Sequence, residues 1–338
     1  MRKTVCIILS VMLMLFPLLP AAADKSPKPT RTPRPTAAPM PTLAPSLDVW
    51  PVLPPLTEDG YLSPEAKVAE FVHTDTENGL WLYISKGLRI KIERFSDPNV
   101  PLIWYEADIR SSGEDELRSV PADPKKPDGA RNKPETIARA NRLVFAINDD
   151  QFVARKSEKK TIGVIARNGK VYQNETPRKG ITSFPNLDTM ALFPGGILRV
   201  YENREHTGQE FMDMGATDVF SFGPVLIRDG KENEKLNQIY PSSMQPRCGF
   251  GMVEPYHYVC VIVEGRHRGA DGTNFLWLAS RMREMGATQA LNLDGGNTAA
   301  IVFMGEKLNA NNNTGPDANV RSISGMIAIG TSELVPEK

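Results

Sequence analysis

Five small or polar residues, Asp294 to Thr298, interrupt two apolar runs in the stretch QALNLDGGNTAAIVF. The pair Asp294-Gly295 between strand-like runs is typical of a tight turn, because glycine adopts positive φ without steric cost. A turn alone needs neither a second glycine, Gly296, nor the amide and hydroxyl of Asn297 and Thr298. The backbone N–H groups of Gly295 to Asn297 could form a concave anion nest with the Asp294 carboxylate at its rim. The stretch therefore predicts a site for a negatively charged group.

Arginines at the ends of apolar runs point to the same chemistry. Arg247 follows proline in QPRCGFG, Arg266 comes after an apolar run in VEGRHRG, and Arg321 precedes the last apolar run in NVRSISGMIAIG. Guanidinium groups bind phosphate oxygens in a bidentate way. One such arginine is more often a surface ion pair than a ligand, but several beside glycine-rich turns indicate an anionic substrate. Glu264, in the same VEGRHRG segment, is a further polar candidate.

A second polar cluster, Asn148, Asp149 and Asp150, follows the apolar run LVFAIN. Like Asp294, it comes after a helix-like segment, a short link and a strand. If the two strands are neighbours, the clusters meet at one end of the sheet, where loops build a cleft. Asp149, Asp150 and Asp294 could also hold a hard cation such as Ca²⁺ or Mg²⁺ through oxygen ligands. The chain lacks the D-x-D-x-D-G loop of such sites, so we assign no metal and no cofactor.

Strands predominate among the elements that must position these residues. Apolar runs recur between turn signals, and ARNGKVY and IRDGKE carry the Asn-Gly and Asp-Gly pairs of short hairpins. Helices are expected at 134–142, which opens with proline, and at 274–285, after which Gly286 fits the C-terminal cap. The sequence therefore predicts an α+β fold: a mixed or antiparallel sheet core with a few packed helices and site loops at the strand ends.

Composition and motifs exclude several classes of protein. Forty basic residues balance forty acidic ones, which gives no case for nucleic acid as a partner. The four histidines are scattered, without an H-E-x-x-H or Cys-x-x-Cys motif, so a thiolate or imidazole metal site is not expected. The chain also lacks the G-x-S-x-G elbow and the Walker loop.

Cys248 and Cys260 flank GFGMVEPYHYV, which reads as two strands joined by a turn near Glu254-Pro255. A hairpin of this length could place the two thiols opposite each other, and exported proteins tolerate disulfides. A change of register by one residue would separate them as two small, buried, unpaired side chains. The sequence leaves both alternatives open.

The N-terminal residues 1–23 have the pattern of a secretory signal peptide. Arg2 and Lys3 precede a nearly continuous apolar run, and three alanines ending at Ala23 form a small-residue cleavage site. The apolar run is short and interrupted by proline, which does not favour a membrane span. We therefore expect a secreted or cell-surface protein.

Residues 24–55 contain ten prolines and several basic residues. Such a segment favours an extended, semi-rigid spacer, either solvated or in contact with an anionic cell-wall polymer. Residues 56–338 hold the strand signals without a second low-complexity gap, so they are expected to form one folded domain.

The order of the motifs in residues 135–330 resembles that of the phosphodiester glycosidase family. The likeness runs from FAINDDQF through ARNGKVY, FSFGPVLIRDGK, PRCGFG and VEGR to LDGGNTA and VRSIS. The family's usual Leu-Asp-Gly-Gly-Gly-Ser-Ser departs here at three positions: Asn297 replaces the third glycine, Thr298 the first serine and Ala299 the second. Glu264 stands in place of an aspartate. The positions that match without change are Asn148, Asp150, Arg247, Arg266, Asp294, Gly295, Gly296 and Arg321.

The resemblance implies hydrolysis of a sugar-1-phosphodiester between the anomeric carbon and the phosphate. In this interpretation Arg247 and Arg266 bind the phosphate, and the amides of Gly295 to Asn297 assist them. Asp294 and Asp150 are the candidates for nucleophile or general base. Asn148 and Thr298 would hydrogen-bond sugar hydroxyls.

The expected partners of such an exported hydrolase are phosphorylated glycans, namely sugar-phosphate wall polymers or exopolysaccharides. Two other hypotheses stay open. The departures at Asn297 and Ala299 are compatible with a non-catalytic glycan- or wall-binding module on the same fold. The third hypothesis is a phosphodiesterase that cleaves the P–O bond.

Overall fold

The computed structural model describes residues 50–153, 163–175, 187–239, 243–310 and 321–337. The chain separates into Met1–Pro41 and Thr42–Lys338, and all of the described residues belong to the second unit. The predicted signal peptide and most of the predicted spacer lie outside the described residues. Among the helices that are described, none is long and apolar enough to cross a membrane.

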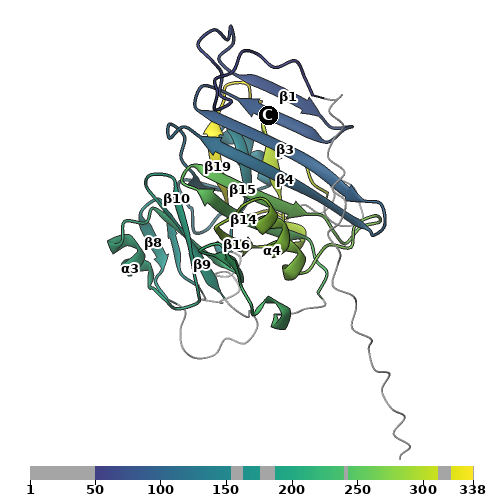
Figure 1. Ribbon diagram of the computed structural model, residues 1–338. Coiled ribbons are helices and arrows are strands. Elements are labelled where there is room, and N and C mark those ends of the chain that lie inside the picture. The colour runs from purple at the N-terminus through teal and green to yellow at the C-terminus, as the bar shows by residue number, and fades with distance from the viewer. Residues whose placement is uncertain (1–49, 154–162, 176–186, 240–242, 311–320, 338) are drawn as a thin grey trace, which may run out of the picture. The chain divides into compact units, whose positions relative to one another are not determined.

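Nine strands form the first sheet, whose middle strands carry much of the candidate site (Figure 1). In spatial order they are β1 (Phe71–Asp75), β2 (Leu80–Ile84), β3 (Leu88–Asp97), β4 (Leu102–Ser111), β15 (His257–Val263), β14 (Arg247–Glu254), β16 (Gln289–Leu293), β12 (Val225–Arg228) and β13 (Lys231–Glu232). The strands from β1 to β4 follow one another along the chain, whereas β15, β14 and β16 come from its last third. Residues far apart in the sequence therefore share this sheet.

Two five-stranded sheets complete the strand framework. The second sheet consists of β10 (Ile197–Tyr201), β9 (Asp188–Phe193), β11 (Asp218–Phe222), β7 (Ile165–Arg167) and β8 (Lys170–Gln173). The third sheet consists of β18 (Glu306–Lys307), β17 (Ile301–Phe303), β6 (Leu143–Asn148), β19 (Gly325–Thr331) and β5 (Arg118–Pro121). Every pairing among the described strands is antiparallel. The predicted α+β class is confirmed, in its antiparallel form.

One hydrophobic core holds the three sheets together. Ile90 and Phe250 enter it from the first sheet, Phe220 from the second, and Phe145 and Ile329 from the third. Each of these side chains is almost fully buried, and burying a large apolar side chain contributes about 1.5–3 kcal/mol. Because each sheet supplies part of this core, the strand ends are fixed relative to one another.

Helices add few but well-defined elements. Helix α1 (Pro134–Ala140) begins with proline, and α4 (Phe275–Glu284) begins at the Asn274 cap, whose side chain accepts a hydrogen bond from the Trp277 N–H. Gly286 follows α4 with φ +87°, as its predicted capping role requires. These two helices confirm the prediction. The described chain adds helix α3 (Gly208–Asp213) and the 3₁₀ turns η2 (Leu236–Gln238) and η3 (Gly296–Thr298).

Helix α4 lies against the middle of the first sheet and crosses β14 (Figure 1). Gly249 of β14 permits this contact, because a Cβ atom there would lie 3.1 Å from Leu278 and 3.2 Å from the sulfur of Met282. The helix also brings Phe275 beside Arg247, the first residue of β14. The packing of α4 thus contributes directly to the candidate site.

The β14–β15 hairpin turns at Pro255-Tyr256, as predicted, and it settles the two alternatives for the cysteines. Cys248 pairs in register with Ile262, and Cys260 pairs with Phe250, so the two thiols are offset by two residues. Both are buried and free. Burial, followed by the neighbouring Cys260, raises the pKa of Cys248 well above that of an ordinary thiol. The unpaired alternative is therefore the one observed.

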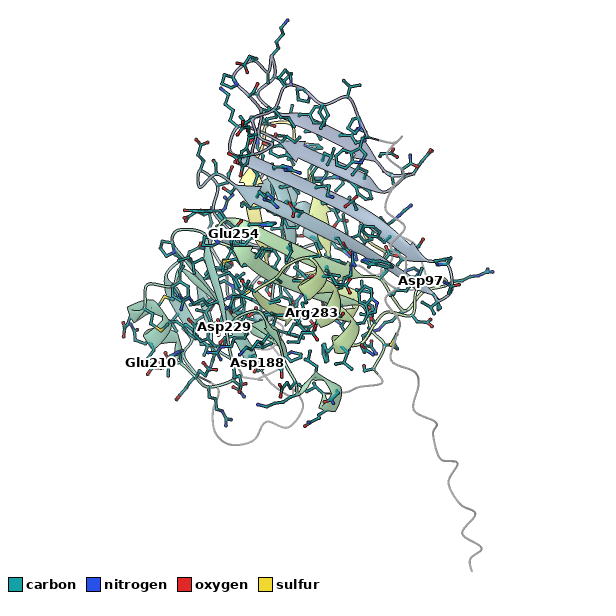
Figure 2. All side chains as sticks on the ribbon, viewed as in Figure 1. Asp97, Asp188, Glu210, Asp229, Glu254 and Arg283 are labelled. Carbon is teal, nitrogen blue, oxygen red and sulfur yellow. The ribbon has the colours of Figure 1, made fainter. Side chains whose placement is uncertain are left out.

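The last residues of the predicted spacer pack on the domain. The Pro55 carbonyl accepts a hydrogen bond of 3.0 Å from the Ser63 N–H, and the Lys91 ammonium lies 5.9 Å from the centre of the Trp50 ring. Lys91 belongs to β3, so this segment reaches the first sheet. In the view of Figure 2, Asp97 at the tip of β3 lies on the side opposite Glu210 of α3.

Candidate functional site

Three strands of the first sheet bring their polar ends to one edge. Arg247 begins β14 and pairs in register with Val263, the last residue of β15, so Glu264 follows beside it. Cys248 pairs with Leu293, the last residue of β16, so Asp294 also leaves at this edge. The antiparallel order therefore gathers Arg247, Glu264 and Asp294 from separate parts of the chain.

The third sheet brings a second set of polar ends to the same place. Asn148 ends β6, which pairs with the beginnings of β17 and β19. The Asn148 side-chain N–H donates to the Asp294 carbonyl at 2.8 Å. The predicted meeting of the two clusters thus occurs, but between two sheets, because β6 and β16 are not neighbours in one sheet.

Steric fit explains the two glycines of the Asp294–Thr298 turn. A Cβ atom at Gly295 would lie 2.5 Å from the Pro246 carbonyl oxygen, and Gly296 has φ +61°. The turn continues into η3 and is not a hairpin, since β16 and β17 belong to different sheets. The Gly296 N–H donates to the Pro246 carbonyl at 3.0 Å. Its predicted role as an anion donor is therefore corrected, because a protein acceptor occupies it.

The Asn148 side chain holds this turn through hydrogen bonds to the backbone. Its Nδ2 group donates to the carbonyls of Asp294 (2.8 Å) and Asp149 (3.0 Å), and its Oδ1 accepts from the Ala300 N–H (2.9 Å). Asp294 begins the turn and Ala300 lies two residues beyond it, so one amide bonds to the backbone on both sides of the turn. The side chain is fully buried. Both ends of the amide thus bind backbone groups, so the predicted contact of Asn148 with a sugar hydroxyl gains no support from this geometry.

Arg247 is a buried cation beside another cation. Its guanidinium donates to the carbonyls of Thr273 (3.2 Å) and Ser243 (3.0 Å) and lies 3.9 Å from the centre of the Phe275 ring. Burial, followed by the nearby charge of Arg266, lowers the pKa of Arg247 to about 10. The group remains charged at neutral pH, at a cost in free energy that a bound anion would offset.

Arg266 and Arg321 contact adjacent residues of the turn. Arg266 donates to the side chains of Gln245 (2.9 Å from Nε) and Asn297 (3.3 Å), while Arg321 donates to the Thr298 hydroxyl at 3.3 Å. Both arginines are exposed, and Thr298 is buried beneath them. The predicted residues Asn297 and Thr298 thus contact two of the predicted arginines.

The three guanidinium groups lack acidic partners in the part of the chain that the structure describes. The contacts of Arg247, Arg266 and Arg321 are carbonyls, amides, a hydroxyl and an aromatic ring. Arg281 of α4 differs, because it forms an ion pair with Glu106. Arginines that serve packing usually pair with a carboxylate, so this arrangement favours an anionic ligand.

Glu264 anchors the loops that surround the site. One carboxylate oxygen accepts from the Ala310 N–H (2.6 Å) and the Tyr105 hydroxyl (3.2 Å), and the other lies 2.9 Å from His267 Nε2. The residue is 4% exposed. Its predicted role in substrate binding is corrected, because both oxygens face protein groups that anchor the neighbouring loops.

Asp150 lies deeper than predicted, with 0% exposure. Its oxygens accept from Arg167 Nη2 (2.6 Å) and from the Ser221 N–H (2.7 Å). The carboxylate is thus enclosed by protein groups, and its predicted role as nucleophile or general base gains no support from this placement. Arg167 was not among the predicted residues. It lies in ARNGKVY, where the Asn-Gly turn was the visible signal, and nothing local marks the arginine as a partner of Asp150.

Asp294 is the remaining candidate carboxylate. It is partly exposed at the edge where the arginines gather. Among the described residues, no group of three or more His, Cys, Asp or Glu side chains is placed so that it could hold a metal ion. The arrangement is thus one partly exposed carboxylate at the start of the turn, two arginines that contact the same turn, and Arg247 at the neighbouring strand end.

The family model of phosphodiester glycosidase matches residues 141–330 of the chain. The chain belongs to the phosphodiester glycosidase family. The matched residues include β6, the arginines and the Asp294 turn. Membership confirms the resemblance inferred from the motifs and makes a hydrolase of this kind the expected activity.

Two similar proteins extend this finding. The catalytic domain of zebrafish N-acetylglucosamine-1-phosphodiester alpha-N-acetylglucosaminidase, auto-inhibited by its pro-peptide, is 17% identical with a TM-score of 0.54, covering 79% of this chain and 90% of that one. At this identity the likeness shows the shared fold. The SPbeta prophage-derived uncharacterized protein YomE of Bacillus subtilis (strain 168) is 24% identical over 176 residues, 52% of this chain. The match covers 26% of the length of that protein.

Proposed function

We propose that this protein is an exported hydrolase that cleaves a sugar-1-phosphodiester between the anomeric carbon and the phosphate. The observation that carries the proposal is the group of three arginines, without described carboxylate partners, around the Asp294 turn. Membership of the phosphodiester glycosidase family supports the reaction class.

The phosphate is bound by Arg247, Arg266 and Arg321. Arg247 supplies a buried charge fixed by two carbonyls and a ring, whereas Arg266 and Arg321 are exposed and would meet the phosphate from the solvent side. Guanidinium groups in these positions also stabilise the negative charge that the departing phosphate gains in the transition state.

Asp294 acts at the anomeric carbon, as nucleophile or as general base for water. A phosphate monoester is a good leaving group, so the reaction needs less help from a general acid than ordinary glycoside hydrolysis. One accessible carboxylate beside the arginines suffices for this chemistry, which is consistent with the burial of Asp150.

The substrate class and location extend the proposal. The signal-peptide pattern ending near Ala23 supports export, and the basic spacer supports contact with the cell wall. Phosphorylated wall polymers and exopolysaccharides are the substrates that such a protein would meet. Nucleic acid has no place in this proposal, because the net charge is zero.

Turnover of synthetic α-sugar-1-phosphodiesters by the purified protein tests the proposal. Release of free sugar and phosphomonoester is expected, and Asp294→Asn should lower kcat by about 10³-fold or more while ligand binding persists. Asp229→Asn is the control: Asp229 accepts a hydrogen bond from Gln289, the first residue of β16, whereas Asp294 follows its last residue. An undiminished rate in Asp294→Asn would remove this residue from the mechanism. Binding without product would favour the glycan-binding module.

A further inference from the structure

Asp150 and Arg167 form a buried pair that has no role in the proposed reaction. Asp150 lies two residues after Asn148, at the exit of β6 in the third sheet. Arg167 ends β7 and Ser221 lies in β11, both in the second sheet. The Asp150 carboxylate accepts from Arg167 (2.6 Å) and from the Ser221 N–H (2.7 Å), so it ties the second sheet to the end of β6.

The surroundings of Arg167 make this connection rigid. Its guanidinium carbon lies 4.0 Å from the centre of the Phe220 ring and 5.1 Å from that of Phe152. Its Nη1 donates to the carbonyls of Ala166 and Val219, and the residue is 2% exposed. A planar guanidinium held on its faces and edges has little freedom to change partners.

The connection continues from Asp150 to the Asp294 turn. Asn148 and Asp150 flank Asp149, whose side chain lies 3.7 Å from Arg167 Nη2 and accepts from the Gln151 N–H. The three-residue segment 148–150 is therefore fixed at both ends. At its first end, the Asn148 amide holds the Asp294 carbonyl and the Ala300 N–H. Displacement of Asp150 would move this clamp.

We propose that the Asp150–Arg167 pair is a positioning device: through Asn148 it sets the orientation of Asp294. This inference rests on the proposed function for the role of Asp294. The pair itself does not touch substrate, because both members are buried. The phosphate-binding arginines belong to other segments, so loss of the pair should affect the chemical step more than binding.

The double variant Asp150→Asn/Arg167→Met separates positioning from stability. Each single change leaves an uncompensated buried group and is expected to lower the melting temperature. The double change removes both charges and should recover most of that loss, while kcat stays about 10–100-fold below wild type with KM within about threefold, because small displacements near reacting groups cost this much. Asp188→Asn is the matched control: Asp188 is buried in β9 of the same sheet and accepts from the Asn203 and Val225 N–H groups, not from Arg167.

Amide exchange of residues 294–303 provides a readout that does not need turnover. The double variant should lose protection in this peptide, which contains the Ala300 N–H bound by Asn148, and Asp188→Asn should not. If wild type shows no turnover, the proposed function fails, and the exchange result still decides whether the pair positions the turn. Recovery of kcat together with stability would overturn the inference. So would a rise in KM alone, or unchanged protection in the double variant.

Discussion

Replacement of Arg247 by methionine should abolish anion binding at little cost in stability. Burial lowers the pKa of Arg247 to about 10, and this shift corresponds to roughly 3 kcal/mol that disfavours the charged form in the folded protein. This penalty is present at every pH below about 10 and is relieved as the pH rises above it. Arg247→Met removes the penalty.

The same substitution loses favourable contacts of similar size. Two hydrogen bonds from the guanidinium to carbonyls and the contact with the Phe275 ring contribute together roughly 3 kcal/mol. The two effects nearly cancel, so the free energy of unfolding should change by no more than about 1–2 kcal/mol. A domain of this size then shifts its melting temperature by about 2–4 °C.

Arg281→Met is the matched comparison. Arg281 also carries a partly buried guanidinium, but hydrogen bonding to Glu106 raises its pKa, so its charge is favoured in the fold. Its removal leaves the buried Glu106 carboxylate without its cation, at a cost of about 3 kcal/mol or more. We therefore expect a clear fall in melting temperature for this variant.

Thermal unfolding with and without a sugar-1-phosphate checks both effects. At a ligand concentration near 100 Kd, binding stabilises the folded state by about 2.7 kcal/mol. This increase should appear in wild type and in Arg281→Met, and should be absent in Arg247→Met. The reasoning would be refuted if Arg247→Met destabilised the protein as much as Arg281→Met, or if it kept the full ligand-induced increase.

Two further substitutions and one labelling experiment test the frame of the site. Gly296→Ala, at φ +61° with its Cβ 3.0 Å from the Arg266 guanidinium, should cost about 1 kcal/mol or more and raise KM by displacing Arg266; an unchanged KM would contradict this. Glu264→Gln should lower the free energy of unfolding by about 1–3 kcal/mol in chemical denaturation while phosphate affinity is kept, and a selective loss of affinity would return Glu264 to the binding residues. Burial raises the pKa of Cys248, so thiol reagents at pH 8 should label it only after unfolding, and rapid labelling of the folded protein would oppose this placement.

The sequence predicted the elements whose ends are set by neighbouring residues in the chain. The Asn274 cap and Gly286 delimit α4, and Glu254-Pro255 marks the hairpin turn. The strands β1 and β5 were missed, because edge strands can remain polar on exposed positions. Helix α3 was missed as well, since its capping box at Thr207 and Glu210 is followed by only six helical residues.

The site was predictable in its location and less so in its roles. Glycine, carboxylate and arginine at strand ends identified the Asp294 turn and its cations. The tasks of Asn148, Asp150 and Glu264 depend on partners that come from other sheets and loops. No sequence pattern near these residues specifies those partners. The sequence therefore could not separate the residues that line the site from those that support it.

Hydrolysis in ¹⁸O-labelled water tests the central claim most directly. If Asp294 acts at the anomeric carbon while the arginines hold the phosphate, mass spectrometry of the products should find the label in the sugar and none in the phosphomonoester. Label in the phosphate would show that the protein cleaves the P–O bond, which contradicts the proposed mechanism.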